Sequence, residues 1–319
     1  MNNTKKHLLF WVPFALVFIG LLVIATLYDY QISEILASKD LINGNYVSTN
    51  LFGRIFKVIG EIPLYLFLLV AAAIIFTASF KIEKKNLRLF LQVLFTIGGI
   101  VAGFFGYYKI GKYLSQIDYD SFRFLYEEIY MFIIYAILAT ILQVALQYIL
   151  SKKHRELCIK LLPFAIIILI TAALSQAIVH GIKPIAARER FRAIYWFEYR
   201  NIETQGFTHW YIFNGNAKEI ADSLGVKKTY FSSFPSGHTA AAGICYSLMF
   251  LPSFFDKLNN KKYRWLFVFV PTLITGIVAF SRIVVGAHYM SDVLFGGTFA
   301  FISSIIAYLI VNKIFRKKA

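Results

Sequence analysis

One stretch near the end of the chain pairs a histidine with an aspartate. His288 and Asp292 are four residues apart, a spacing that places two side chains on one face of a helix. A carboxylate in that position can hold an imidazole in one tautomer and stabilise its protonated form, which leaves the other ring nitrogen to attack an electrophile. An aspartate in the first turns of a membrane helix is costly unless it is paired. The pair could also serve packing alone.

A second stretch, Pro235-Ser236-Gly237-His238, is typical of a helix start, with proline at the first helical position. The free backbone N–H groups at such an end attract phosphate. Gly237 would let an anion approach the backbone closely, and His238 could donate a proton to a leaving oxygen. The same four residues could be a helix start without any chemistry.

A third stretch supplies cations. Lys183 and Arg190 are seven residues apart, which is two helical turns, so we expect them to point the same way. Together with Arg282 they could hold the oxygens of a phosphoryl group. Additional positive potential comes from three nearby arginines: Arg188, Arg192 and Arg200. Attraction of lipid head groups is the alternative role of such a cluster.

The elements that must position these residues are membrane helices. Of the 319 residues, 58% are hydrophobic and only 16% are charged, whereas soluble domains carry about 25% charged residues. Eight apolar runs have the length of about 20 residues that crosses a bilayer. They lie at roughly 8–27, 60–80, 88–110, 126–150, 160–181, 236–254, 264–281 and 288–312. The first is interpreted as an uncleaved span, because it is too long for a signal peptide. The predicted fold is an all-α, polytopic membrane helical bundle.

The net charge of +16 could suggest a nucleic-acid partner, but the basic residues lie in short clusters between the apolar runs. Basic loops of this kind are cytoplasmic. We therefore expect both termini and loops 81–88, 152–160 and 257–264 in the cytoplasm. The opposite side receives three longer segments: 28–58, 111–125 and 182–235. The last should be a partly helical excursion, and all three chemical stretches should share this non-cytoplasmic face. No nucleic-acid partner is expected.

Taken together, the three stretches resemble the type 2 phosphatidic acid phosphatase superfamily, which also includes vanadium haloperoxidases and bacterial acid phosphatases. The family pattern is K-x6-R-P, then P-S-G-H, then S-R-x5-H-x3-D. The order and internal spacings match from Lys183 through Ser281 and Arg282 to Asp292, but Phe191 stands where the pattern has proline. Common membrane members have six spans with three before the first motif. Five precede it here, so two are additional.

This resemblance implies a two-step mechanism. His288 attacks phosphorus and becomes a phosphohistidine, Asp292 orients that histidine, and His238 protonates the leaving group and then activates water. The resemblance assigns the phosphoryl oxygens to five residues: Lys183, Arg190, Ser236, Gly237 and Arg282. Neither a metal ion nor another cofactor is expected, and the two cysteines, Cys158 and Cys245, have no metal-binding spacing.

The expected function is hydrolysis of a lipid phosphate or diphosphate in the bilayer. Candidate substrates are undecaprenyl diphosphate, phosphatidylglycerophosphate and phosphatidic acid. Residues 1–150 are expected to form accessory spans, and residues 151–319 the phosphatase core. Two alternatives stay open at this point. A phosphotransferase would pass the phosphoryl group to a lipid or sugar, and a non-catalytic lipid-binding or transport protein would not react at all.

Overall fold

A computed structural model describes residues 3–42, 45–46 and 48–316. The parts of the expected cytoplasmic termini at 1–2 and 317–319 lie outside the described residues. The chain divides into two compact units. The first unit comprises residues 1–53, 179–237 and 279–297. The second unit comprises residues 54–178, 238–278 and 298–319.

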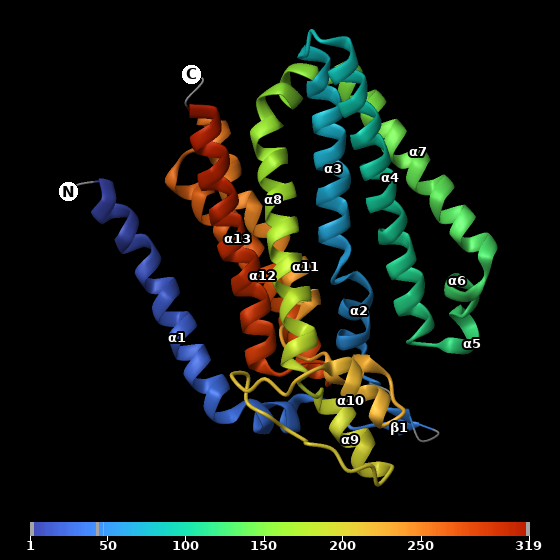
Figure 1. Cartoon of the computed structure of the whole chain (residues 1–319). Helices are drawn as coiled ribbons and strands as arrows, with labels where there is room; N and C mark the ends of the chain where they lie inside the picture. The colour runs from blue at the N-terminus through green and yellow to red at the C-terminus, as the bar shows by residue number, and fades with distance from the viewer. Residues whose placement is uncertain (1–2, 43–44, 47, 317–319) are drawn as a thin grey trace. The chain divides into compact units, whose positions relative to one another are not determined.

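The described chain is predominantly helical, as predicted (Figure 1). The longer helices are α1 (Asn3–Leu36), α2 (Leu51–Ile59), α3 (Ile62–Ala78), α4 (Lys85–Ser115), α7 (Ile129–Lys153), α8 (Arg155–Ala186), α9 (Phe191–Tyr199), α12 (Lys261–Val284) and α13 (Met290–Arg316). The shorter ones are η1 (Ser79–Lys81), α5 (Tyr119–Phe122), α6 (Phe124–Glu127), α10 (Ala217–Ser223), η2 (Lys228–Phe231), α11 (Gly237–Ala242), η3 (Gly243–Phe254) and η4 (Asp256–Leu258). Two short strands, β1 (Leu41–Ile42) and β2 (Asn45–Tyr46), pair antiparallel. An all-α membrane bundle is therefore confirmed as the fold class.

Among the described residues, seven helical segments are long and apolar enough to cross a membrane. They are Ala15–Leu36, Leu51–Lys81, Lys85–Ser115, Ile129–Lys153, Arg155–Tyr199, Tyr263–Val284 and Met290–Phe315. Helices suit a bilayer because they satisfy their backbone polar groups internally. These seven segments account for seven of the eight expected spans.

The remaining expected span, 236–254, is helical but is not a single α-helix. Its first turns form α11, and the following residues tighten into the 3-10 helix η3, which contains Pro252. A proline removes one backbone donor, and a 3-10 helix rises about 2.0 Å per residue instead of about 1.5 Å. The combined length of α11 and η3 is therefore about 33 Å, close to the bilayer core thickness of about 30 Å.

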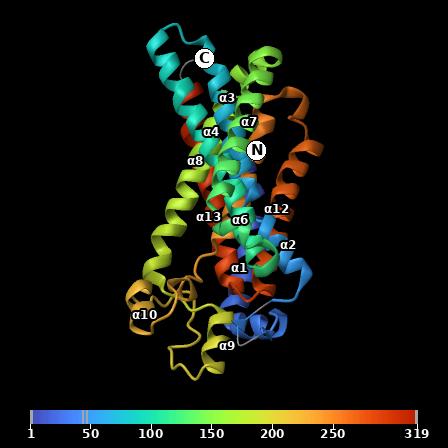
Figure 2. The ribbon, with the colours of Figure 1, turned by 90° about the vertical axis from the view of Figure 1, so that its right-hand side faces the viewer.

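Small residues bring the helices of the second unit together. α3, α4 and α7 contact one another and run side by side in both views (Figures 1 and 2). A Cβ built on Gly103 of α4 would lie 3.0 Å from the Cβ of Ala139 on α7, so the two helices approach as closely as their backbones allow. Close contact of this kind holds helices together in lipid, where apolar burial alone does not.

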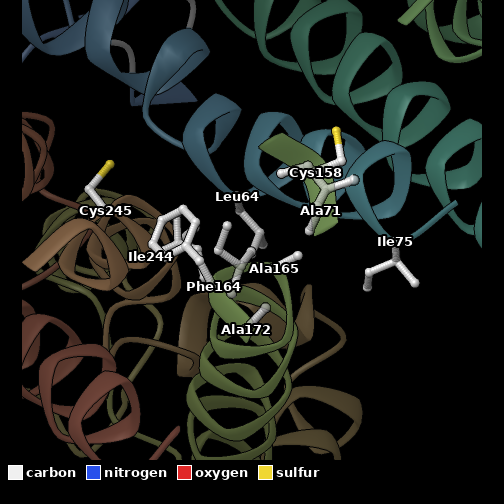
Figure 3. Packing of buried hydrophobic residues seen from close by; sticks show 12 residues of the cluster. Leu64, Ala71, Ile75, Cys158, Phe164, Ala165, Ala172, Ile244 and Cys245 are labelled. Carbon is white, nitrogen blue, oxygen red and sulfur yellow. The ribbon is translucent and has the colours of Figure 1, made fainter. Parts of the chain in front are cut away.

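The main apolar cluster of the second unit lies between α3, α8 and the α11–η3 segment. Leu64, Phe164 and Ile244 are buried in it together with small side chains such as Ala71 and Ala165 (Figure 3). Both cysteines belong to this cluster as free thiols. The cluster includes Ala241, so it packs against α11, the helix that carries His238.

The first unit holds the expected excursion, which is partly helical as predicted. After α8 ends, the chain forms α9, α10 and η2 before it reaches α11. Phe197, Ala221 and Phe231 are buried where α9, α10 and η2 meet. A helix-capping bond from the backbone N–H of Lys218 to the Asn216 side chain fixes the start of α10.

Candidate active site

The loop between α12 and α13 places His288. The N–H groups of Ala287 and His288 both donate to the Arg282 carbonyl, at 3.1 and 3.3 Å, and this turns the chain back on itself. Gly286 has φ +60°, and a Cβ there would lie 2.6 Å from the Tyr46 hydroxyl. Any other side chain would therefore be both strained and obstructed. The turn at Gly286 therefore places His288 in the loop after the end of α12 and before the start of α13.

The imidazole of His288 is held by a backbone carbonyl. Its Nδ1 lies 2.6 Å from the Ser233 carbonyl oxygen. A carbonyl oxygen can only accept a hydrogen bond, so Nδ1 carries the proton and Nε2 carries the lone pair. This tautomer is the one required for attack through Nε2. Ser233 was not a predicted site residue, although it lies two residues before the Pro235 motif.

Asp292 is arranged differently from expectation. The distance from His288 Nδ1 to Asp292 Oδ2 is 3.7 Å, too long for a hydrogen bond. Oδ2 instead accepts bonds from the Ser233 hydroxyl at 2.5 Å and from the Tyr289 N–H at 2.8 Å. The shared helical face was a wrong prediction, because α13 begins only at Met290. Asp292 caps that helix and fixes Ser233, and Ser233 in turn orients the imidazole.

The surroundings of His288 favour its neutral form. Its residue exposure is only 2%, and this burial lowers the pKa of His288 well below its usual value. The Asp292 carboxylate opposes that shift in the pKa of His288, and the nearby cations Arg190 and Lys183 reinforce it. A neutral imidazole with a lone pair on Nε2 is a competent nucleophile.

Arg188 forms a buried ionic centre with Asp29 and Asp292. Its guanidinium donates to Asp292 Oδ1 at 2.6 Å and to Asp29 Oδ2 at 2.9 Å, and all three side chains are at most 1% exposed. It also donates to the Thr208 carbonyl at 2.8 Å and lies over the Tyr289 ring. From the sequence, Arg188 was expected only to add positive potential. The structure shows a fixed role, which is to hold Asp292 in place.

Asp29 reaches this centre from α1. The helix departs from helical geometry at Tyr28, directly before Asp29. The Asp29 carboxylate accepts the N–H of Ser291 at 2.9 Å and also its hydroxyl, so it binds the first turn of α13. An acidic residue at the end of an apolar run was the one sequence signal that could have indicated this site.

Lys183 and Arg190 meet at one carbonyl oxygen. Lys183 Nζ lies 2.9 Å and an Arg190 terminal nitrogen 3.3 Å from the Ser232 carbonyl. The two-turn spacing was a wrong explanation, because α8 ends at Ala186 and Arg190 precedes α9 in an extended conformation. The excursion brings the two cations together instead. They converge on the residue adjacent to Ser233, which holds His288.

Of the remaining predicted phosphate-binding residues of the first unit, Ser236 and Arg282 are buried and Gly237 is partly exposed. Ser236 is fully buried, and its N–H donates to the Asp292 carbonyl at 2.9 Å. Gly237 begins α11, so Pro235 does not occupy the first helical position as predicted. A Cβ on Gly237 would lie 3.8 Å from Cε of Lys183. Arg282 is 2% exposed at the end of α12.

The first unit therefore contains seven of the predicted site residues: Lys183, Arg190, Ser236, Gly237, Arg282, His288 and Asp292. His238 belongs to the second unit and follows Gly237 directly in the chain. Its Nδ1 lies 3.2 Å from Oε1 of Glu61. Within the described ranges, no three His, Cys, Asp or Glu side chains are grouped so that they could hold a metal ion.

These features define a polytopic membrane protein with a buried histidine beside clustered cations. Residues 164–316 match the sequence model of the PAP2 superfamily, and this span includes all three motifs. The match confirms the resemblance, and together with the membrane-length helices it supports a membrane phosphatase in general terms. No curated protein and no solved structure matches the chain. The boundary expected at residue 150 stays a prediction.

Proposed function

We propose that this protein hydrolyses a lipid phosphate or diphosphate through a phosphohistidine on His288. The observation that carries the proposal is the 2.6 Å contact between His288 Nδ1 and the Ser233 carbonyl, which assigns the lone pair to Nε2. The low pKa of His288 supports the same role, because burial keeps the ring neutral before attack.

In the first step, Nε2 of His288 attacks phosphorus and the bond from phosphorus to the lipid oxygen breaks. His238 gives its proton to that oxygen, and the lipid leaves as an alcohol or a monophosphate. The phosphorylated ring is positive, and Asp292 at 3.7 Å stabilises that charge. In the second step, His238 takes a proton from water, the water oxygen bonds to phosphorus, and the N–P bond breaks. Inorganic phosphate leaves and His288 returns to its neutral form.

Cations take the place of a metal ion in this proposal. Lys183, Arg190 and Arg282 hold the phosphoryl oxygens, with Ser236 and the N–H of Gly237 as further donors. Support comes from the convergence of Lys183 and Arg190 on the Ser232 carbonyl, next to the residue that positions the nucleophile. Fixed positive groups stabilise the charge that spreads over the oxygens during phosphoryl transfer.

The membrane setting supports a lipid substrate. Lys183, Arg282 and His288 lie at or beside the ends of α8, α12 and α13, which is the depth at which a lipid head group lies. An acyl or polyprenyl tail could then stay in the bilayer during the reaction. By the distribution of basic loops, we assign the site to the non-cytoplasmic face and both termini to the cytoplasm.

A panel of lipid phosphates tests the function. Undecaprenyl diphosphate, phosphatidylglycerophosphate and phosphatidic acid are each presented to the purified protein in vesicles, and released inorganic phosphate is measured. We expect release from at least one lipid, with no loss after EDTA treatment. Phosphoryl transfer to an added acceptor without phosphate release would favour the transferase. Binding without either reaction would favour a lipid-binding or transport protein.

The pH profile tests the state of the nucleophile. Because the pKa of His288 lies well below its usual value of about 6.5, the ring stays neutral in mildly acidic solution. Protonation removes the Nε2 lone pair only when the pH falls through that lowered pKa. We therefore expect the His288-dependent part of kcat/KM to persist as the pH falls through the usual histidine value. The pH dependence of kcat/KM is the measurement. The titration of the substrate phosphate is determined separately by phosphorus NMR, so that it can be distinguished from that of His288. An acidic limb centred above the usual histidine value would contradict the assignment.

A further inference from the structure

A polar cluster in the second unit surrounds the second histidine. Glu61 lies between α2 and α3, and Lys109 and Tyr113 are one turn apart on α4. Glu61 Oε1 is 3.2 Å from His238 Nδ1 and accepts a 2.9 Å bond from the Tyr113 hydroxyl. Glu61 Oε2 is 2.9 Å from Lys109 Nζ. The three residues that contact or support His238 all precede residue 164, where the family match begins.

Both oxygens of this carboxylate are occupied by fixed partners. The Glu61 and His238 side chains are each only 12% exposed, and a charge in such surroundings is costly unless it is paired. Lys109 balances the carboxylate from one side, and Tyr113 fixes its orientation from the other. Glu61 therefore presents one oxygen to the imidazole in a defined position.

The ring of His238 is also confined by packing. Its centroid lies 5.1 Å from that of the Tyr113 ring. A Cβ built on Gly60 would lie 3.6 Å from Cδ2 of His238 and 2.5 Å from the Phe56 carbonyl, so the backbone before α3 passes close to the ring. The chain before Glu61 thus limits rotation of the imidazole as well as bonding to it.

The partners of the two histidines differ in charge. His288 Nδ1 meets a neutral carbonyl oxygen, whereas His238 Nδ1 meets a carboxylate oxygen. A carboxylate stabilises the protonated imidazole and holds one proton on Nδ1, so the proton exchanged in a reaction is the one on Nε2. The first arrangement suits a nucleophile, and the second suits an acid that gives and later recovers a proton.

We propose that Glu61 is a positioning residue for His238, and that α3 and α4 supply the orientation of the general acid through Glu61, Lys109 and Tyr113. This inference rests on the proposed phosphatase function. Under this proposal α3 and α4, which precede the family match, help to orient the general acid. Glu61 itself touches no reacting atom and acts through the imidazole.

The test compares two leaving groups. Glu61→Gln keeps the size of the side chain but removes its charge. An alkyl lipid phosphate needs a proton on its departing oxygen, whereas p-nitrophenyl phosphate has a leaving group that departs without one. We expect kcat/KM of the variant to fall by about tenfold to a hundredfold for the lipid and by less than about threefold for the aryl phosphate. Because kcat/KM reports only steps up to departure of the alcohol, later hydrolysis does not obscure the comparison.

Two further variants make the comparison specific. Tyr113→Phe keeps the ring but loses the hydroxyl bond to Glu61. Its kcat/KM should also fall more for the lipid than for the aryl phosphate, but by less than in Glu61→Gln. Glu127→Gln makes the same chemical change at an exposed residue of α6 that bonds Tyr119, and it should leave both substrates unaffected. An equal fall for both substrates in Glu61→Gln, or no fall, would overturn the inference.

A measurement without turnover separates this inference from the proposed function. Nitrogen NMR of the labelled imidazoles, assigned with His238→Ala, reports which ring nitrogen of His238 carries the proton. We expect Nδ1–H in the unaltered protein and a changed tautomer balance in Glu61→Gln. An unchanged spectrum would overturn the role of Glu61 even if the protein is a phosphatase. Absence of phosphate release from the unaltered protein, with the NMR change present, would overturn the function alone.

Discussion

Replacement of His288 by alanine is expected to reduce phosphate release by at least about a thousandfold while the protein stays folded. The reason is that no other group can supply the Nε2 lone pair that the Ser233 carbonyl reserves. Phosphorylated protein should also disappear, because its nitrogen–phosphorus bond requires this ring. The measurements are the initial rate with the best lipid of the panel and the acid-labile phosphate trapped on the protein.

The control for this variant is His154→Ala, which removes an exposed imidazole at the junction of α7 and α8. It should retain full activity. His288→Ala loses one hydrogen bond to a buried carbonyl, which costs about 1–3 kcal/mol, so the thermal transition in detergent should remain cooperative. If His288→Ala kept most of the activity of the unaltered protein, the nucleophile would be a different residue.

Replacement of Arg188 by alanine should lower the free energy of unfolding by about 3–5 kcal/mol. The change removes the only cation that contacts both Asp29 and Asp292 within the described structure, and it leaves two buried carboxylates without compensation. Activity should fall as well, because Asp292 would no longer hold the Ser233 hydroxyl. Unfolding in mixed micelles of increasing denaturing detergent, followed by circular dichroism, measures the change.

Three variants isolate the ionic origin of this loss. Arg188→Lys should recover only part of the stability, because a single ammonium cannot reproduce the guanidinium's separate bonds to Asp29, Asp292 and the Thr208 carbonyl. Adding Asp29→Asn to Arg188→Ala should restore some stability by removing one unpaired charge. Arg200→Ala, at an exposed arginine over the Trp196 ring, should change stability by less than about 0.5 kcal/mol. Equal effects of Arg188→Ala and Arg200→Ala would contradict the central role of Arg188.

The fold was largely predictable because each apolar run carries its own signal. Seven of the eight expected spans are long helices, since about 20 apolar residues in lipid have few alternatives to an α-helix. The segment at 236–254 differs in helix type, because hydropathy does not report how tightly a helix is wound. Its glycines and Pro252 were visible in the sequence, but only packing determines that η3 forms a 3-10 helix.

The site was predictable where its residues lie within a motif and not where contacts cross the sequence. His288, Asp292 and Gly237 follow from short spacings. Ser233 contacts Asp292 across 59 residues, and Arg188 contacts Asp29 across 159 residues. No periodicity connects positions so far apart, because only the folded chain brings them together. The same reason explains why the bonds of Asp292 to the Ser233 hydroxyl and the Tyr289 N–H were not predicted.

The three residues of the Arg188 ionic centre are synthesised in a fixed order. A ribosome makes Asp29 first, Arg188 159 residues later and Asp292 after a further 104 residues. The first counter-ion, on α1, is therefore made before the guanidinium, and the second is made only with α13. A chain made without α1 would insert that arginine unaccompanied.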